Sequence, residues 1–98
     1  MLKESNTVNV QEELSSGKKL LVFYADWCGP CRMYKPVLEE YSAKSGVDVI
    51  RVNIDSEKEL AREMQVQSIP ATFVYENGAV TKAFGGYRPL EQLEQELN

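Results

Sequence analysis

Two cysteines, separated by two residues, follow directly on the most apolar stretch of the chain. The continuous run from Leu20 to Ala25 is typical of a strand that is covered on both faces. The motif W-C-G-P-C at residues 27–31 comes immediately afterwards. Residues i and i+3 of a first helical turn lie roughly 5–6 Å apart, which a disulfide tolerates. The pattern therefore predicts a strand leading into a helix whose first turn carries Cys28 and Cys31 as a redox pair.

Other uses of a cysteine pair fit this sequence less well. Structural zinc usually takes four Cys or His ligands, whereas the chain has two Cys and no His, so a zinc site needs a second pair from another subunit. Covalent haem attachment requires His after the second cysteine, where Arg32 stands. A structural disulfide across so short a loop restrains the unfolded chain very little. Redox exchange is the favoured interpretation, and no metal site is expected.

Composition and charge limit which other classes of protein this chain can belong to. Ninety-eight residues predict one domain, 1–98, and 43% hydrophobic with 27% charged residues is typical of a globular protein. The net charge of −4 argues against nucleic acid as a main partner. No apolar run approaches the roughly 20 residues that cross a bilayer, so no membrane association is expected. The first five residues lack the apolar core of a signal peptide, which predicts a cytoplasmic protein whose cysteines are mostly reduced.

The hydrophobic pattern predicts alternating strands and helices. The expected strands are 1–5 (an edge strand), 19–24, 47–53, 72–76 and 80–84, and the expected helices are 7–16, 28–45, 56–64 and 89 onwards. The second and third strands should pair in parallel through a right-handed crossover. Ser56 and Glu59 fit a capping box that starts the third helix. Asn77-Gly78 predicts a tight hairpin between the last two strands.

The second helix contains Pro36, which removes one helical hydrogen bond and is expected to bend the axis against the sheet. Its apolar residues Met33, Val37, Leu38 and Tyr41 are expected to form the buried face. Met33 and Tyr41 are therefore interpreted as core residues and not as cofactor contacts.

These motifs together resemble the thioredoxin family over nearly the whole chain. The matching features are W-C-G-P-C at 27–31, the helix proline Pro36, Asn53-Ile54-Asp55, Ile69-Pro70 and Gly85-Gly86. C-x-x-C alone is a moderately specific signal, but this combination at this spacing is very specific. The resemblance implies an α/β thioredoxin fold. Its central mixed sheet of four to five strands is flanked by helices on both faces, and its last hairpin lies antiparallel to the middle strand.

The placement of the thiols predicts their roles. Unpaired N–H groups and partial positive charge at a helix N-terminus favour a thiolate, so the pKa of Cys28 is expected below that of a free thiol. Thioredoxins are a known example of this effect. Cys28 is expected to be the nucleophile that attacks a client disulfide, because it should be the more exposed of the two thiols. Cys31, shielded one turn inside the helix, is expected to resolve the mixed disulfide.

Client binding is expected on the surface around Cys28. The residues flanking the cysteines should form one side of a groove, and an exposed Trp27 is favoured over a buried one. The resemblance supplies the other side. It implies a cis peptide bond before Pro70, with the preceding backbone pairing with an extended client segment. The expected groove residues are Trp27, Gly29, Pro30, Ile69, Pro70 and Gly86.

The sequence departs from the family pattern near this site. Val22 stands where thioredoxins usually carry a buried acid beneath the second cysteine, so a proton acceptor is missing. Slower resolution and a shifted reduction potential are expected. Asp26 is close in sequence but is expected to point to solvent. Ala71 follows Pro70 where Thr is common, which is expected to change client preference slightly. Arg51 replaces a frequent Lys, and its charge is expected near the site.

The resemblance implies a protein-disulfide reductase with no bound cofactor beyond its own disulfide. Gly85-Gly86 is too short for a dinucleotide fingerprint, so electrons must come from another protein, and the expected donor is a flavin-containing thioredoxin reductase. The expected partners are disulfide-containing clients and this reductase, and the protein is expected to be a monomer. Two alternatives stay open: a non-enzymatic binding module with a thioredoxin fold, and an oxidoreductase dedicated to one client.

Overall fold

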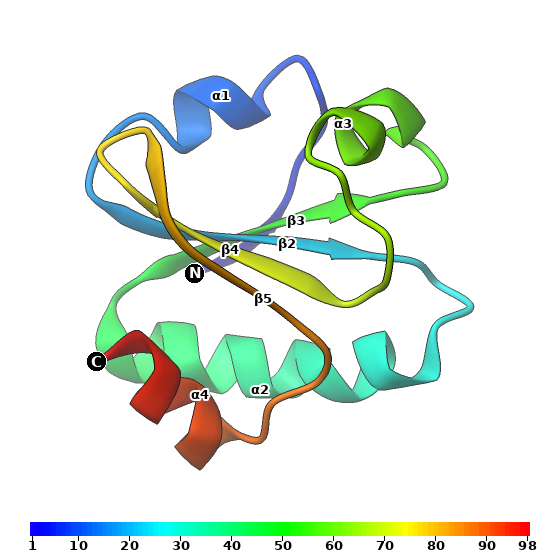
Figure 1. Cartoon of the computed structure of the whole chain (residues 1–98). Helices are drawn as coiled ribbons and strands as arrows, with labels where there is room; N and C mark the ends of the chain where they lie inside the picture. Colours follow the sequence, from blue (N-terminus) through cyan, green and yellow to red (C-terminus); the bar gives the residue numbers. More distant parts are fainter.

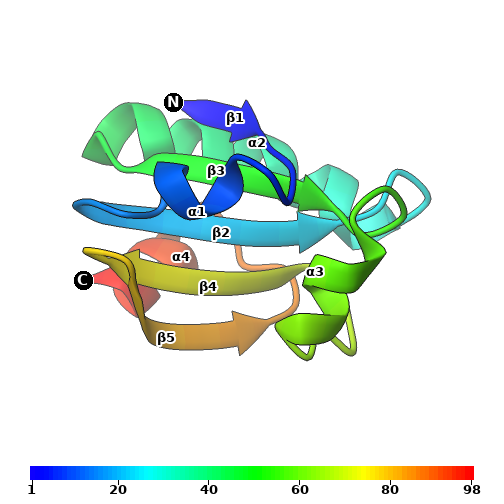
Figure 2. The same ribbon diagram turned by 90° about the horizontal axis from the view of Figure 1, so that it is seen from above.

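A five-stranded mixed sheet forms the centre of the computed structural model, which describes residues 1–98. The strands are β1 (Leu2–Glu4), β2 (Lys18–Tyr24), β3 (Asp48–Asn53), β4 (Ala71–Glu76) and β5 (Ala79–Gly85). Their spatial order is β1-β3-β2-β4-β5, as Figure 2 shows from above the sheet. β3 pairs in parallel with both β1 and β2, whereas β4 is antiparallel to β2 and β5. The expected strands and the antiparallel hairpin are confirmed.

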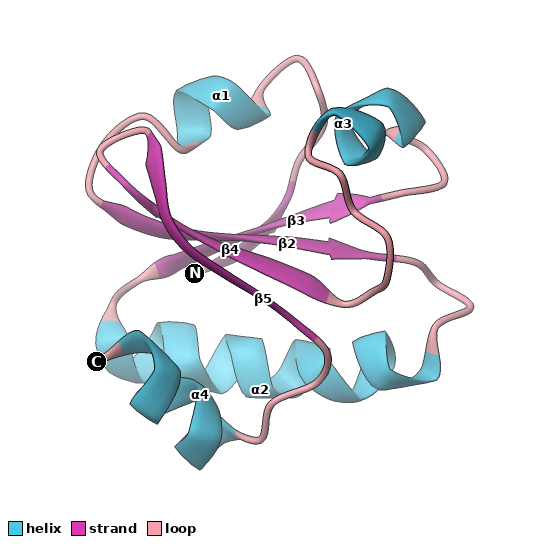
Figure 3. Cartoon of the chain, viewed as in Figure 1, coloured by secondary structure: helices cyan, strands magenta, loops and turns pink.

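Helices cover both faces of this sheet (Figure 1). They are α1 (Val10–Glu13), α2 (Gly29–Ser45), α3 (Lys58–Glu63) and α4 (Leu90–Leu97). α1 and α3 lie above the sheet in the view of Figure 3, and α2 and α4 lie below it. This arrangement confirms the predicted α/β thioredoxin fold with helices on both faces.

The central strand β2 divides the core into two halves because successive side chains point to opposite faces. Leu20 and Val22 pack toward α2 and α4, whereas Leu21 and Phe23 pack toward α1 and α3. All four side chains are at most 1% exposed. Complete burial of such a side chain contributes about 1.5–3 kcal/mol. The apolar run therefore holds both layers of helices on one strand, and this strand ends at the cysteine motif.

The first helix is shorter than predicted, since α1 spans only Val10–Glu13 and not 7–16. Polar side chains compete with the helical hydrogen bonds at both ends. The Asn9 N–H donates to Oδ1 of Asn6 at 3.0 Å, which forms a turn ahead of the helix. The Ser15 hydroxyl donates to the carbonyl oxygen of Glu12 at 2.7 Å as the helix ends.

The predicted buried face of α2 was wrong at one residue. Met33 is 58% exposed, and Tyr34 is fully buried in its place. Tyr34, Leu38 and Tyr41 follow the i, i+4, i+7 spacing of one helical face, and Met33 lies about 100° away from that face. The presence of Pro36 within α2 is as expected.

Two predicted helix starts were also wrong in detail. α3 begins at Lys58, and no side chain caps it, because the Ser56 hydroxyl donates instead to the carbonyl oxygen of Asn53 at 3.2 Å. The expected capping box is therefore absent. Pro89 precedes α4 and is not its first residue, because its ψ of 159° is extended. The Asn77-Gly78 hairpin is confirmed, and both residues have the positive φ that a type I′ turn requires.

A buried hydroxyl pair joins α2 to the sheet, and it leads to a prediction about alkaline stability. Tyr34 and Thr72 are fully buried, and their hydroxyl oxygens lie 2.9 Å apart. Burial raises the pKa of Tyr34 to about 12, against about 10 in the unfolded chain. The unfolded state therefore releases this proton first. The resulting stabilisation is complete below pH ~10 and is lost as the pH rises toward ~12.

Tyr34→Phe is expected to abolish that part of the alkaline slope, which corresponds to about 2–3 kcal/mol in the free energy of unfolding. At neutral pH the variant should lose about 1–3 kcal/mol, because the Thr72 hydroxyl is left unsatisfied. The double variant Tyr34→Phe/Thr72→Val should recover part of that loss. Urea titrations at several pH values test this, and identical alkaline slopes for wild type and Tyr34→Phe would contradict it.

Candidate active site

The two cysteines sit at the start of α2, directly after β2. Cys28 is the N-cap with extended backbone (φ −89°, ψ 110°), and Pro30 occupies the first turn, where its missing N–H costs no helical hydrogen bond. The backbone N–H of Cys31 donates to Sγ of Cys28 at 3.3 Å. The sulfur of Cys28 thus occupies the capping position at which a helix stabilises negative charge.

Cys28 and Cys31 form a disulfide, with Cα atoms 5.2 Å apart. Both cysteines are largely buried with Ala25 in a small cluster of their own. Cys28 is 6% exposed and Cys31 is 2% exposed. Of the two sulfurs, Cys28 is therefore the one nearer the surface. The structure brings the pair together in its oxidised state.

The loop before β4 packs against Cys28. The Ile69–Pro70 peptide bond is cis, as the resemblance implied. The carbonyl oxygen of Ile69 lies 3.9 Å from Sγ of Cys28. The N–H of Gly86 donates to the carbonyl oxygen of Pro70 at 2.8 Å, and its φ of +90° favours glycine. Loops distant in sequence therefore meet at one thiol.

The residues flanking the cysteines form the exposed part of the site. Trp27 is 66% exposed and Pro30 is also exposed, whereas Gly29 is half-buried with open space around it. The Trp27 indole N–H donates to Oδ2 of Asp55 at 2.9 Å. Sequence reasoning missed this role of Asp55, although it singled out the Asn53-Ile54-Asp55 motif. The contact fixes a large apolar ring beside the thiols.

Strand β2 offers no carboxylate at position 22, where the family usually carries its buried acid. Val22 is 1% exposed and packs among apolar side chains. Its neighbours across the sheet are Arg51 on β3 and Thr72 on β4. Asp26 is exposed, as predicted. The position that would hold a buried proton acceptor is therefore filled by an aliphatic side chain.

A cavity of about 350 Å³ opens beside Cys31, on another side of it from Ile69. Its lining residues are Tyr24, Ala25, Asp26, Cys31, Arg32, Lys35 and Arg51. The charge of Arg51 thus lies near the site, as expected. Sequence reasoning missed that Arg32 and Lys35 also reach this cavity, because a one-residue difference in helix phase decides which side they face.

Arg51 is held in place by two side chains from other strands. Its Nε donates to Oε2 of Glu4 at 2.9 Å, and its guanidinium lies 3.6 Å from the centre of the Tyr24 ring. The Tyr24 hydroxyl in turn donates to Oε1 of Glu4 at 2.6 Å. The pKa of Tyr24 is raised, chiefly by burial and secondly by the hydrogen bond to Glu4. Its phenol is therefore neutral at physiological pH. We call Glu4, Tyr24 and Arg51 the Arg51 cluster.

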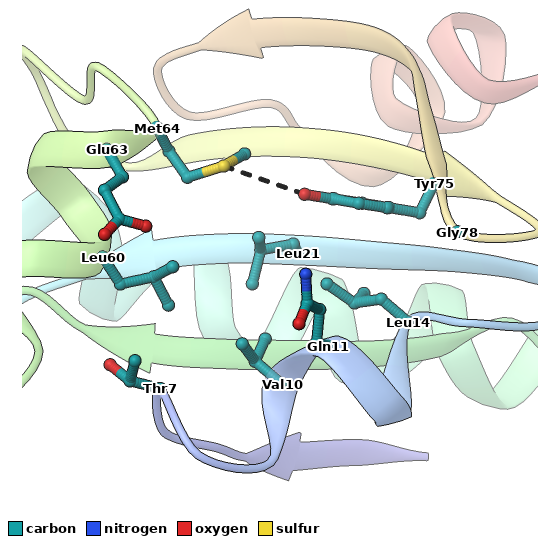
Figure 4. A pocket seen from close by; sticks show the side chains of 10 residues that line it. All are labelled: Thr7, Val10, Gln11, Leu14, Leu21, Leu60, Glu63, Met64, Tyr75 and Gly78. Carbon is teal, nitrogen blue, oxygen red and sulfur yellow. Dashed lines mark hydrogen bonds between the residues drawn. The ribbon is translucent and has the colours of Figure 1, made fainter.

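A second cavity, of about 300 Å³, lies away from the cysteines between α1 and α3 (Figure 4). Its walls are mainly apolar, and the Tyr75 hydroxyl donates to Sδ of Met64 at 3.8 Å across it. It contains no thiol and reflects the incomplete cover that the short helix α1 gives this face.

The structure shows no group of three or more His, Cys, Asp or Glu placed to bind a metal ion. None of its helices has the length and apolar character needed to cross a membrane.

Comparisons with known proteins agree with this geometry. Residues 2–98 match the family model described as Thioredoxin. The chain is 37% identical over 100 residues to a protein of Listeria monocytogenes named thioredoxin, covering all of this chain and 97% of the relative. It is 40% identical over 92 residues to the thioredoxin of Alicyclobacillus acidocaldarius, covering 91% and 88% of the two chains. The thioredoxin of Bacillus subtilis is 38% identical over 88 residues, covering 88% and 85%.

Proposed function

The chain belongs to the thioredoxin family and is a thiol-disulfide oxidoreductase, and we propose that it reduces protein disulfides with Cys28 as nucleophile and Cys31 as resolving thiol. The observation that carries this assignment is the position of Sγ of Cys28, which accepts the N–H of Cys31 at the start of α2. Backbone donors and the helix dipole at this position favour the thiolate form. A thiolate is the species that attacks a disulfide.

The proposed reaction has two exchange steps. The Cys28 thiolate attacks one sulfur of the client disulfide, and the other client sulfur leaves as a thiolate that takes a proton from water. The Cys31 thiol then loses its proton and attacks Sγ of Cys28, which breaks the bond between Cys28 and the client. The client gains two electrons in total, and the Cys28–Cys31 disulfide carries the corresponding oxidation.

The client is proposed to bind along the groove formed by Trp27, Gly29, Pro30, Ile69, Pro70 and Gly86. Neither the N–H nor the C=O of Ile69 pairs with another backbone group of the protein. An extended client segment can therefore hydrogen-bond there as an added strand. The exposed indole of Trp27, fixed by Asp55, supplies apolar contact area on the other side.

The electron donor is proposed to be a flavin-containing thioredoxin reductase. The sequence of this chain contains no dinucleotide-binding motif, so the electrons must come from another protein. The redox group is the Cys28–Cys31 disulfide, and no further cofactor or metal is required. We also infer that residues 1–98 act as one monomeric thioredoxin domain in the cytoplasm. The single five-stranded sheet is compatible with one domain.

Insulin reduction in the presence of dithiothreitol tests the proposal. Wild-type protein is expected to accelerate precipitation of the insulin B chain, and the variant Cys28→Ser/Cys31→Ser should not exceed dithiothreitol alone. Equal rates for the two proteins would identify a non-enzymatic binding module. Activity on a small disulfide without activity on insulin would instead indicate an oxidoreductase dedicated to one client.

A further inference from the structure

We propose that the cationic side chains lining the cavity beside Cys31 assist the resolving step. They stabilise the Cys31 thiolate in place of a buried carboxylate base. This proposal rests on the proposed function, because it concerns the second exchange step. Cys31 lines a cavity that contains three cationic side chains, and buried Val22 fills the position at which the family usually carries an acid.

No group around Cys31 other than Asp26 is suited to accept its proton at neutral pH. Tyr24 holds its proton because its pKa is raised. Tyr34 and Thr72, on the sheet side, bond to each other, and the pKa of Tyr34 is about 12. Cys31 must therefore lose its proton either to Asp26 or to solvent that enters the cavity. Exposed side chains line this cavity, and its volume of about 350 Å³ admits water.

The charges around the cavity favour a thiolate. Arg32, Lys35 and Arg51 contribute three positive charges, and Asp26 contributes one negative charge. Counting Glu4, which pairs with Arg51 from outside the cavity, the balance is still +1. A positive balance next to a thiol favours its ionised form.

The three cations differ in how they are held. Arg51 is rigid, since its side chain is 8% exposed and is fixed by Glu4 and Tyr24. Arg32 is anchored at the rim, because its Nη1 donates to the carbonyl oxygen of Asp26 at 3.1 Å. Lys35 is exposed and forms no ion pair, so its charge can be reversed with little effect on folding.

The resolving step then runs as follows. The Cys31 thiol gives its proton to water in the cavity, and the cations stabilise the resulting thiolate. This thiolate attacks Sγ of Cys28 in the mixed disulfide. The Cys28–client bond breaks, and the client sulfur leaves as a thiolate that water protonates. Arg51 and Lys35 line the cavity and not the proposed client groove, so they act through Cys31 as positioning residues.

A series of charge variants tests this proposal. Stopped-flow reaction with one equivalent of a chromogenic aryl disulfide gives two phases, attack by Cys28 and then release of the second aryl thiolate by Cys31. The pH profile of the second phase reports the pKa of Cys31. Lys35→Glu should raise that pKa and slow the second phase at neutral pH on the order of three- to tenfold at low salt. The effect should shrink as the salt concentration rises.

The control for Lys35→Glu is Lys44→Glu on the same helix. Lys44 is also exposed but lies nine residues further along α2, roughly 13 Å by the helical rise, and is absent from the cavity. The Lys44→Glu substitution should leave the pH profile of the second phase unchanged. Arg51→Met should move the profile in the same direction as Lys35→Glu, and Arg51→Lys should restore it.

Asp26→Asn separates the two possible proton acceptors by the sign of its effect. Removal of this negative charge should speed the second phase if the cations act as proposed, and should slow it if Asp26 is the base. A slower Asp26→Asn variant would overturn the proposal. Superimposable profiles for wild type, Lys35→Glu and Lys44→Glu would overturn it as well. Either result would be compatible with normal insulin reduction by the wild-type protein. The proposed reductase function itself would fail only if the wild-type protein did not reduce insulin.

Discussion

Cys31→Ser is expected to accumulate clients as mixed disulfides on Cys28, whereas Cys28→Ser is expected to trap none. The reason is the difference in position between the two sulfurs. Sγ of Cys28 caps α2 and lies next to the client groove, but Cys31 lies one turn further in and is 2% exposed. Without the Cys31 sulfur, the first exchange proceeds and the second has no internal nucleophile.

The effect on turnover should be large for both variants, on the order of 10³-fold or more in insulin reduction, because a nucleophile and its partner act as a unit. Non-reducing gels with thiol quenching, followed by mass spectrometry of the trapped bands, identify the cysteine involved. The double variant Cys28→Ser/Cys31→Ser is the control for non-covalent association. Equal trapping by both single variants would contradict the assigned roles.

Val22→Asp is expected to speed the resolving step near neutral pH and to destabilise the fold by about 3 kcal/mol. The new carboxyl would lie beneath α2 at a position that is 1% exposed. Burial of a carboxylate costs several kcal/mol, and its sheet neighbours Arg51 and Thr72 can offset part of this. The same carboxylate would supply the base that the natural sequence lacks.

The stability of this variant should depend on pH with a defined sign. Burial raises the pKa of the new carboxyl above its unfolded value of about 3.9, so the unfolded state releases the proton first. The loss of stability relative to wild type should therefore grow as the pH rises from about 4 to the folded pKa. Val22→Asn is the control, because it is polar and cannot titrate. Urea titrations and the two-phase aryl-disulfide assay measure both effects. If Val22→Asp resolves no faster than Val22→Asn, position 22 is not the site of a catalytic base.

The strand content of the protein could be predicted because it depends on local patterns. The apolar run of β2 is buried on both faces, and Asn77-Gly78 supplies the positive φ values of the final hairpin. These signals lie within a few residues of the structure that they specify. The order of the strands came from the family resemblance, since periodicity does not determine which strands pair.

Short helices were harder to predict because their ends depend on competing hydrogen bonds. Asn6 and Ser15 shorten α1, and Ser56 bonds back to Asn53 and not forward into α3. Both outcomes depend on differences of about 1 kcal/mol between alternative partners of one side chain. The phase error at Met33 has a different origin, because packing against the sheet buries the aromatic Tyr34 and leaves Met33 exposed.

The thiol motif and the cis proline could be identified from the sequence, but the contacts that hold Arg51 beside them could not. Cys28, Cys31 and the cis proline belong to contiguous motifs with a specific spacing. The Arg51 cluster instead joins residues that are 20 to 47 positions apart, from three different strands. No local pattern reports such contacts, and Glu4 in particular gave no signal.

Glu4 on the edge strand β1 is the counter-ion of Arg51, which lines the cavity beside Cys31. β1 has only three residues and pairs with a single neighbour, so it should fray more readily than the interior strands. Each fraying event would withdraw the counter-ion of Arg51 and briefly leave that guanidinium unneutralised. Thermal fluctuations at the margin of the protein would thereby modulate the electric field at its redox centre.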